Sequence, residues 1–562
     1  MNIPKFLTNK IVLCCISGIF FGLSFPPVNL YFLVFIAFAI YIYIVITSET
    51  YRQVIFRSYI IFVVWEMIAV SWIGLSGFTK PEYFMVIGGL LTGVLHPIVY
   101  LLPPTVIFFF IARNLKFKKH QELILLFLPP VWITFEYLQT TNELTFPWLA
   151  LAYTQTYNLS KVQYIDITGM YAVTLWICLI SIVLFYGARK VLGNEWQLKS
   201  KQVLTTAIII IVLYFIPDLY SMITSPGSKY TKNYDDGKIN IAIIQPSKNP
   251  WFKWSSDQFK ITEEYVDIMK DAANGNPKPE LIILPETSLP YILRMPLNET
   301  KHLIIKEFID KENIPVLIGT PDILYYPDSG YVPPDARVFS DGRKYDVFNS
   351  AVLLEKGVDK DDYQSHDKFK LVIGSERMPY QDRLLFLRDI IQMSVGLSNF
   401  QIGKDTVLFD LDGKYKFNTA ICYESVFPEF FAHYVDMGAD FSVIITNDGW
   451  WGKLFGTYQH NQYATFRAIE NRRWIARSAN TGISCTIDPY GNMYDATEIN
   501  ERAIINTEIG IRKEKTFFTR NGDVFSKLML WSAIASFFIV LARKYKKKEL
   551  LKFTRKLFCF FH

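Results

Sequence analysis

The segment INIAIIQ (Ile239–Gln245) divides the chain into two regions of different character. It is a short run that is apolar on both faces, as expected of a β-strand buried between two layers. Before it, long apolar runs extend from Ile11 to about Pro217, and after it short β-rich runs alternate with helical patterns. One more long apolar run begins at Val524. The sequence therefore predicts a membrane part, an α/β domain and a final membrane segment with a basic tail, at 1–221, 222–523 and 524–562.

The composition supports this division. Of the 562 residues, 51% are hydrophobic and 20% are charged, which is too apolar for a disordered chain or a single soluble domain. The net charge of +6 is small for this length, so we expect no nucleic-acid partner. Six cysteines exclude a disulfide scaffold.

Eight apolar stretches are long enough to cross the roughly 30 Å of hydrocarbon in a bilayer, which takes about 20 helical residues. They are 11–27, 30–47, 54–77, 84–112, 122–139, 167–187, 203–221 and 524–542. The first resembles a signal peptide, but it has no small-residue cleavage site and a second stretch follows at once. We therefore expect it to be retained as a helix.

The distribution of Lys and Arg predicts the orientation, because cytoplasmic loops keep positive charge. The loops on one side carry, among others, Arg52, Arg57, Arg113, Arg189 and Lys190, and the C-terminal tail is basic from Arg543 to Lys556. The short loops on the other side contain only Lys80 and Lys161. We expect both termini in the cytoplasm and residues 222–523 outside it.

The loop 140–166 is too long for a tight turn and contains Phe146-Pro147-Trp148-Leu149. An aromatic cluster at the membrane edge fits two interpretations, an interfacial belt or a site that holds a lipid acyl chain. The sequence leaves both open.

Strand and helix patterns alternate in the α/β domain. Apolar runs at 281–284, 316–318, 441–446 and 484–488 predict further strands, and helical spacing marks 257–273, 300–312 and 457–475. Asp412-Gly413, between Thr406–Leu411 and Lys414–Ile421, predicts a two-residue hairpin. We expect a layered α/β sandwich.

The commoner catalytic motifs are absent from this sequence. There is no G-x-S-x-G elbow, no H-E-x-x-H, no phosphate-binding Gly-Lys-Ser/Thr loop and no paired C-x-x-C. The seven His are scattered, so a Ser-His or zinc site has little support. We expect neither a metal nor another cofactor.

A thiol remains as the candidate nucleophile. Only Cys422 and Cys485 fall in the α/β domain. Cys485 lies inside the apolar run ISCTI, which favours an inert buried thiol. Cys422 ends the strand KFNTAI and precedes Tyr423 and Glu424, so we expect an accessible sulfur at a strand-to-helix turn, where amides can stabilise an oxyanion.

Such a thiol needs a base and an oxyanion donor, and the candidates are a carboxylate and a Lys. Glu286 directly follows the buried strand LIILP. Lys368 lies in the charged run YQSHDKFKLVIGSE (363–376). Taken alone, each has a simpler explanation, a solvated carboxylate for Glu286 and a solvated edge strand for Lys368.

Together these segments resemble the nitrilase superfamily. Glu286 in LPETSLP, Lys368 with Glu376 eight residues later, and Cys422 in ICYES look like its Glu-Lys-Cys triad. The membrane stretches resemble its membrane-integrated branch, the bacterial apolipoprotein N-acyltransferase family. Further similar segments are FPW at 146–148, Gln245-Pro246 with Lys253-Trp254, FNSAVLL at 348–354, TNDGWWG at 446–452, 459–482 and IDPYG at 487–491.

The resemblance implies an αββα catalytic domain on the periplasmic side of the bacterial inner membrane. Nothing in the sequence demands more than a monomer. The resemblance also implies transfer of an acyl chain from a phospholipid, typically phosphatidylethanolamine, through a Cys422 thioester. The acceptor is the α-amine of the diacylglyceryl-cysteine that begins an apolipoprotein, and the kinetics are ping-pong.

The resemblance also implies roles for individual residues. Glu286 is the base, Lys368 holds the oxyanion and Glu376 orients Lys368. Supporting roles fall to Tyr423 and Glu424 beside the nucleophile, Trp254 on a gating loop, and Phe146 and Trp148 near the lipid portal. The sequence departs from the family at Ile373-Gly374-Ser375, where Pro-Phe-Gly is usual. The resemblance therefore does not determine the conformation of this loop.

Two other functions also fit these residues. A membrane-anchored nitrilase-type amidase would hydrolyse an amide or nitrile with the same triad. A lipid- or lipoprotein-binding protein would have lost activity in its outer domain and keep an unreactive Cys422.

Overall fold

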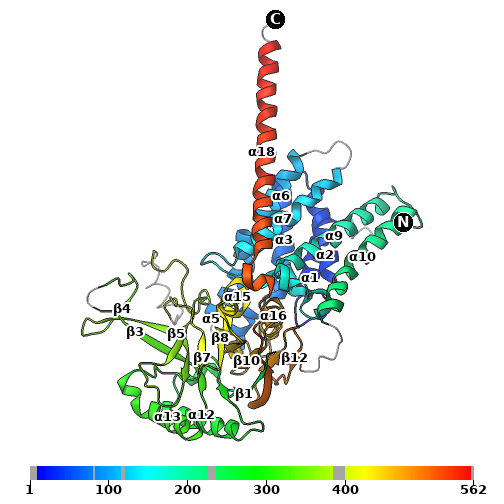
Figure 1. Cartoon of the computed structure of the whole chain (residues 1–562). Coiled ribbons are helices and arrows are strands. Elements are labelled where there is room, and N and C mark those ends of the chain that lie inside the picture. The colour runs from blue at the N-terminus through cyan, green and yellow to red at the C-terminus, as the bar shows by residue number, and fades with distance from the viewer. Residues whose placement is uncertain are drawn as a thin grey trace.

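The computed structural model places an α/β domain at one end of a helical bundle, and the long helix α18 (Val524–Phe558) runs along the bundle and beyond it (Figure 1). The structure describes residues 9–79, 83–115, 121–225, 236–327, 330–383 and 399–558. Lys80, one of the two basic residues expected on the outer side, lies outside these ranges.

Every apolar stretch expected to span the membrane contains helix. The helices are α1 (Lys10–Leu23), α2 (Leu33–Ile46), α3 (Tyr51–Ala69), α4 (Trp72–Thr79), α5 (Tyr83–His96), α6 (Leu102–Asn114), α7 (Leu128–Leu138), α9 (Tyr171–Leu192), α10 (Lys201–Thr224) and α18. The stretch 54–77 is divided between α3 and α4, and the stretches 84–112 and 122–139 are irregular. A π-turn at Pro97–Leu101 joins α5 to α6, and a 3₁₀ segment at Gln121–Phe127 leads into α7. The cause is proline: Pro97 and the prolines at the starts of α6 and α7 lack the N–H that a continuous α-helix requires.

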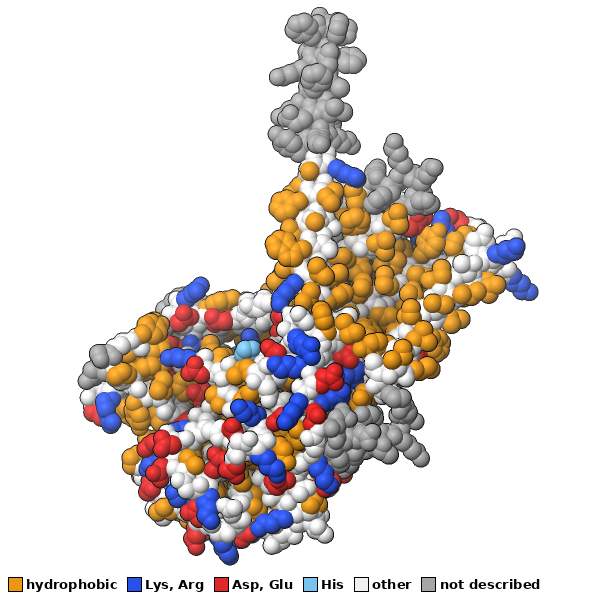
Figure 2. All heavy atoms as spheres, viewed as in Figure 1, with side chains coloured by type: hydrophobic (Ala, Val, Ile, Leu, Met, Phe, Trp, Pro, Cys, Tyr) orange, Lys and Arg blue, Asp and Glu red, His pale blue; other side chains and the backbone are white. Residues whose placement is uncertain are grey.

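Four helical segments in the described part of the chain are long and apolar enough to cross a bilayer. They are Met85–Asn114, Tyr171–Leu192, Lys201–Thr224 and Val524–Lys544, and Lys10–Leu23 and Leu33–Ile46 are shorter apolar helices. Apolar side chains cover the outer surface of the bundle, above the mixed charges of the α/β domain (Figure 2). A surface this apolar is typical of contact with lipid.

Among the described basic residues expected in the cytoplasm, Arg52 and Arg57 lie at the bundle end remote from the α/β domain. The near end is identified by Gln459, whose side chain donates to the carbonyls of Pro26, after α1, and Ala69, at the end of α3. Arg52 and Arg57 belong to the opposite end of α3. Lys161, expected on the outer side, is buried and pairs with Asp218, which balances its charge.

The α/β domain contains two sheets. One has the order β13-β1-β2-β3-β5-β4, with β6 also paired to β5, and the other has the order β12-β11-β10-β9-β8-β7. The strands of the first are β1 (Lys238–Gln245), β2 (Leu281–Ile283), β3 (Val316–Tyr325), β4 (Arg337–Val338), β5 (Lys344–Leu354), β6 (Gln364–Asp367) and β13 (Ala503–Gly510). Those of the second are β7 (Phe409–Leu411), β8 (Tyr415–Ile421), β9 (Phe441–Thr446), β10 (Ile475–Ala479), β11 (Cys485–Ile487) and β12 (Met493–Tyr494).

Alternation along the strands builds four layers. In β1, Ile241 and Ile243 pack between the sheets against residues such as Ile421 and Val443 of the second sheet. The intervening Ala242 faces α12 (Gln258–Ala273) and α13 (Glu299–Glu312). On the other side, α15 (Pro428–Met437) and α16 (Phe455–Asn471) cover the second sheet. The expected αββα sandwich is confirmed.

Two local predictions have different outcomes. The hairpin is present, with φ of 52° and 69° at Asp412 and Gly413 between β7 and β8, but its predicted two-residue length is wrong, because Leu411 pairs with Tyr415 and Lys414 joins the loop. The helix predicted over 457–475 is wrong at its end. The helix stops at Asn471, Arg472 takes the left-handed conformation with φ of 47°, and Ile475 begins β10. The apolar residues that continue the helical pattern pair with β9 instead and form a strand.

Candidate active site

Cys422 lies where strand β8 ends and a 3₁₀ turn, Cys422–Val426, begins. Its φ of 52° is in the left-handed region, which is strained for a residue with a side chain and is found preferentially at functional sites. The predicted strand-to-helix turn is therefore present. The predicted accessibility is not, because Cys422 is only 7% exposed.

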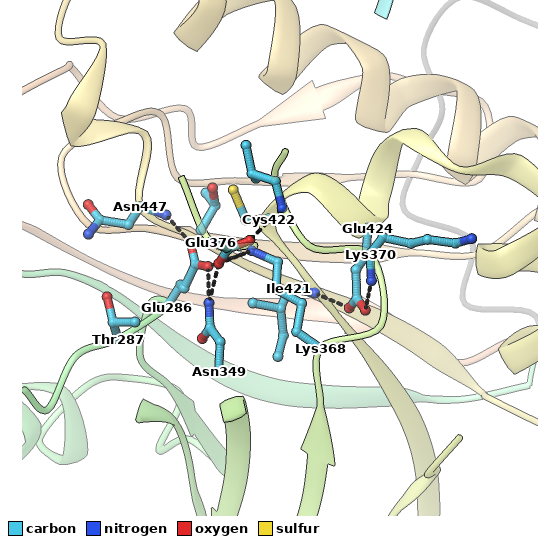
Figure 3. Close-up of polar contacts among 12 residues, drawn as sticks. Glu286, Thr287, Asn349, Lys368, Lys370, Glu376, Ile421, Cys422, Glu424 and Asn447 are labelled. Atoms are coloured by element: carbon cyan, nitrogen blue, oxygen red, sulfur yellow. Dashed lines mark hydrogen bonds and ion pairs between the residues drawn. The ribbon is translucent and has the colours of Figure 1, made fainter. Parts of the chain in front are cut away.

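Glu286 follows β2 and is buried beside Cys422 (Figure 3). Its Oε1 accepts hydrogen bonds from Lys368 Nζ at 2.9 Å and Asn349 Nδ2 at 2.8 Å, and its Oε2 accepts from the Asn447 amide at 3.0 Å. A side chain on Gly319 would place its Cβ 2.6 Å from the Glu286 Cα, so only glycine lets β3 approach this segment. Glu286 is held rather than solvated.

Lys368 lies directly after β6 and is only 1% exposed, which excludes the solvated edge strand. Its Nζ lies 2.9 Å from Glu376 Oε1 as well as from Glu286. Asn349 Nδ2 also donates to Glu376 Oε1, at 2.8 Å. Two carboxylates thus share one ammonium and one amide, and Figure 3 shows the four side chains beside Cys422.

The charges of this group shift the pKa values of the Lys and the thiol. Burial alone would lower the pKa of Lys368, but the Glu286 and Glu376 carboxylates outweigh it and raise this pKa well above its usual value. Burial and the Glu286 carboxylate raise the pKa of Cys422, against the opposing effect of Lys368. The resting site therefore holds a protonated thiol beside a permanent ammonium.

The loop that departs from the family pattern forms a closed turn. Gly374 has φ of 79°, and its amide donates to the Arg377 carbonyl. Glu376 Oε2 accepts from the Val372 amide at 2.8 Å, which fixes the carboxylate on the Lys368 side. The altered residues preserve the contact of Glu376 with Lys368.

Glu424 and Tyr423 brace the nucleophile. Glu424 is fully buried and accepts hydrogen bonds from the amides of Phe369 and Ile421, at 2.6 and 2.8 Å. It thereby ties the residue after Lys368 to the residue before Cys422. The Tyr423 hydroxyl donates to the Thr145 carbonyl of the membrane part at 3.0 Å.

The interpretation of Trp148 as part of an interfacial aromatic belt is wrong. Its side chain is 1% exposed, and its indole N–H donates to Gln459 Oε1 of α16 at 2.7 Å. Its ring stacks on Tyr423 at 6.3 Å between centroids. Phe146 is partly buried and packs against His96 of α5. An aromatic pattern at the end of a span looks the same whether it faces lipid or another domain.

Trp254 is 45% exposed and directly follows the short helix α11 (Pro250–Lys253). It makes none of the contacts described above around Cys422. Its predicted role in gating stays a prediction.

His460 is a site residue that the sequence did not reveal. Its Nε2 lies 3.1 Å from the Cys422 carbonyl oxygen, and its Nδ1 lies 2.8 Å from Asp448 Oδ1. Asp448 also binds Arg477 at 2.7 Å. Cys422, Asp448 and His460 donor atoms lie within 4.8 Å of one another, but the guanidinium already occupies the carboxylate, so we assign no metal here. The ring supports the strained backbone of the nucleophile.

Lys253 is a second residue near the site whose contacts the sequence did not reveal. It is buried, and its Nζ donates to the Thr287 carbonyl and lies 3.3 Å from Thr287 Oγ1, directly after Glu286. Burial lowers the pKa of Lys253 to about 7, although the Glu286 carboxylate acts to raise it. In the sequence Lys253 is noticed only as part of the segment Lys253-Trp254, which resembles the family and indicates no contact with Thr287.

Lys253→Met should change how stability depends on pH. Between about pH 7 and the ordinary pKa of 10.5, the unfolded chain holds a proton on Lys253 that the folded chain lacks, so this group makes stability rise with pH. The variant's gain in melting temperature over the parent should thus be largest near pH 7 and shrink towards pH 10. Thermal unfolding at several pH values measures it, with exposed Lys356→Met as control. A pH-independent difference contradicts the assignment.

Comparisons with known proteins agree with both parts of the molecule. Residues 17–183 match the family model for the apolipoprotein N-acyltransferase N-terminal domain, and residues 240–511 match the carbon-nitrogen hydrolase model. In both parts the chain is similar to apolipoprotein N-acyltransferases. The helical bundle corresponds to the first of these models and the αββα sandwich to the second.

Relatives of this family are similar over nearly the whole chain. The apolipoprotein N-acyltransferases of Chlorobaculum tepidum and Geobacter metallireducens are each 27% identical, over 96% of this chain and 98% and 96% of their own lengths. Among solved structures, a nitrilase-superfamily protein of Saccharomyces cerevisiae is 17% identical with a TM-score of 0.35, covering 49% of this chain and 90% of its own. The named relatives and the apolar helices indicate a bacterial membrane protein.

Proposed function

We propose that this protein is an apolipoprotein N-acyltransferase that moves an acyl chain from a membrane phospholipid to the α-amine of a diacylglyceryl-cysteine. The observation that carries the proposal is the buried group of Glu286, Lys368 and Cys422 in a domain joined to an apolar helical bundle. Phosphatidylethanolamine is the proposed donor, and the N-terminal cysteine of an apolipoprotein is the acceptor.

In the first half-reaction Glu286 takes the Cys422 proton as the sulfur attacks the sn-1 ester carbonyl. Lys368, held by Glu286 and Glu376, and a backbone amide stabilise the oxyanion. The tetrahedral intermediate collapses and breaks the ester C–O bond, and Glu286 returns the proton to the leaving alkoxide. The products are a lysophospholipid and a thioester on Cys422.

In the second half-reaction the acceptor amine attacks the thioester carbonyl. Glu286 takes a proton from the amine, the C–S bond breaks, and the sulfur leaves as a thiolate that regains the proton. Because each substrate meets the same Cys422 in turn, the kinetics are ping-pong. Neither half-reaction draws on a cofactor.

The charge distribution supports the proposed placement in the membrane. Arg52, Arg57 and Arg189 lie at the bundle end remote from the α/β domain, which we assign to the cytoplasm. Eight spans, at 1–221 and 524–562, then frame a catalytic domain at 222–523 on the periplasmic side of the inner membrane. The site faces the bilayer surface, where both substrates carry their ester groups. The protein acts as a monomer.

Product analysis tests this function. Purified protein in vesicles of phosphatidylethanolamine, supplied with a diacylglyceryl-cysteine peptide, should release lysophospholipid and N-acylated peptide in equal amounts. Free fatty acid without acylated peptide would identify a hydrolase. Binding of the peptide with neither product would identify an inactive binding protein.

A further inference from the structure

A cavity of about 650 Å³ opens between two loops of the α/β domain. The first loop follows β1 and the second follows β9. The lining residues are Ser247, Asn249 and Pro250 of the first loop, Gly449–Leu454 of the second, and Thr481 and Asn500.

Both loops touch the segment that carries the base. The Asn447 amide, at the start of the second loop, donates to Glu286 Oε2 at 3.0 Å. Lys253, after the first loop, donates to the Thr287 carbonyl. Asp448, which precedes the cavity residue Gly449, has a carboxylate oxygen within 4.8 Å of Cys422 Sγ. The cavity is therefore on the Glu286 side of the nucleophile.

The lining combines apolar side chains, among them Trp450, Trp451 and Leu454, with the polar groups that a peptide backbone needs. Asn249, Asn500, Ser247 and Thr481 offer amides and hydroxyls that both donate and accept, as the backbone N–H and C=O groups of a polypeptide require. Thr481 is 5% exposed, and its hydroxyl has no hydrogen-bond partner among the described residues. Such a buried polar atom is unfavourable until it finds a partner.

We propose that this cavity binds the polypeptide that follows the acylated cysteine of the acceptor. The inference rests on the proposed function. In that reaction the acceptor's amine gives its proton to Glu286. The polypeptide of the acceptor continues from the carbonyl group of the same cysteine. Each extended residue advances about 3.3 Å, so the residues after the cysteine reach from the Glu286 side into the cavity.

A phospholipid headgroup fits the cavity less well. Phosphoethanolamine carries a phosphate and an ammonium, which call for cationic and anionic partners together. The lining includes Lys453 but no carboxylate. The observations thus favour the peptide over the headgroup as the ligand of this cavity, and the experiment below distinguishes the two.

The double variant Asn249→Ala/Lys453→Ala tests the proposal, because both side chains are exposed at the rim of the cavity. Losing two hydrogen-bonding groups should raise KM about tenfold for a diacylglyceryl-cysteine octapeptide. KM for diacylglyceryl-cysteine amide, which has no following residue, should stay unchanged. The rate of thioester formation on Cys422 should also be unchanged. Exposed Lys356→Ala is the matched control.

Three results would overturn the proposal: an unchanged KM for the octapeptide, an equal rise for the single-residue acceptor, or slower thioester formation, which would assign the cavity to the headgroup. If the parent protein forms no thioester, the proposed function fails separately. Binding of a fluorescent lipopeptide by the parent and the double variant then still decides the cavity proposal, since about tenfold weaker binding is expected only of a peptide site.

Discussion

Cys422→Ala should abolish acyl transfer, with a loss on the order of 10⁴ or more in kcat. The reason is that the thiol forms the covalent intermediate, and the buried site around it offers no second thiol within the group formed with Glu286 and Lys368. The measurement is N-acylated peptide formed per enzyme per minute from phosphatidylethanolamine. The variant should fold normally, because alanine removes one buried sulfur at a turn.

Cys485→Ala is the matched control. Cys485 is the other cysteine of the α/β domain, fully buried in β11, where its sulfur lies 3.5 Å from Asn461 Oδ1. Its loss should leave kcat within about threefold, in keeping with an inert core thiol. Full activity in Cys422→Ala, or inactivation by Cys485→Ala in a folded protein, would assign the nucleophile elsewhere.

Glu286→Gln should lower the rate of thioester formation by about 10² to 10⁴, which is about 3 to 5 kcal/mol in the barrier. Glutamine keeps the shape of the side chain and an acceptor for the Asn447 amide. It cannot take the Cys422 proton, and it removes one of the two carboxylates that hold Lys368. Rapid-quench measurement of the acyl-enzyme separates this step from the second half-reaction.

Exposed Glu263→Gln on α12 serves as the control for the same chemical change. It should leave the acylation rate unaltered. The assignment of the base fails if Glu286→Gln forms the thioester at the parental rate while its melting temperature is unchanged.

The reacting residues could be predicted because each has a local signature. Glu286 follows an apolar strand, Cys422 ends another, and Lys368 and Glu376 keep a fixed separation. Their partners have no such signature. Asn349 lies in FNSAVLL, a segment that resembles the family, but its contact with Glu286 and Glu376 arises only because β5 packs beside β3 in the sheet.

The predictions that the structure contradicts failed for physical reasons. The helical pattern continues through Arg472, but strand pairing at Ile475 is formed by residues distant in the sequence. Trp148 follows the pattern of a membrane-edge aromatic and instead fills the contact between the bundle and α16. The seven His are scattered in sequence and give no sign of a shared site, whereas folding brings His460 beside the Cys422 carbonyl.

The most direct measurement is the mass of the Cys422-containing peptide after incubation with a phosphatidylethanolamine of defined sn-1 chain and no acceptor. The account predicts that this peptide gains the mass of that acyl chain as a hydroxylamine-labile thioester, which disappears when a diacylglyceryl-cysteine peptide is added. An unmodified Cys422 in protein that still N-acylates the peptide, or the acyl mass on another residue, would contradict it.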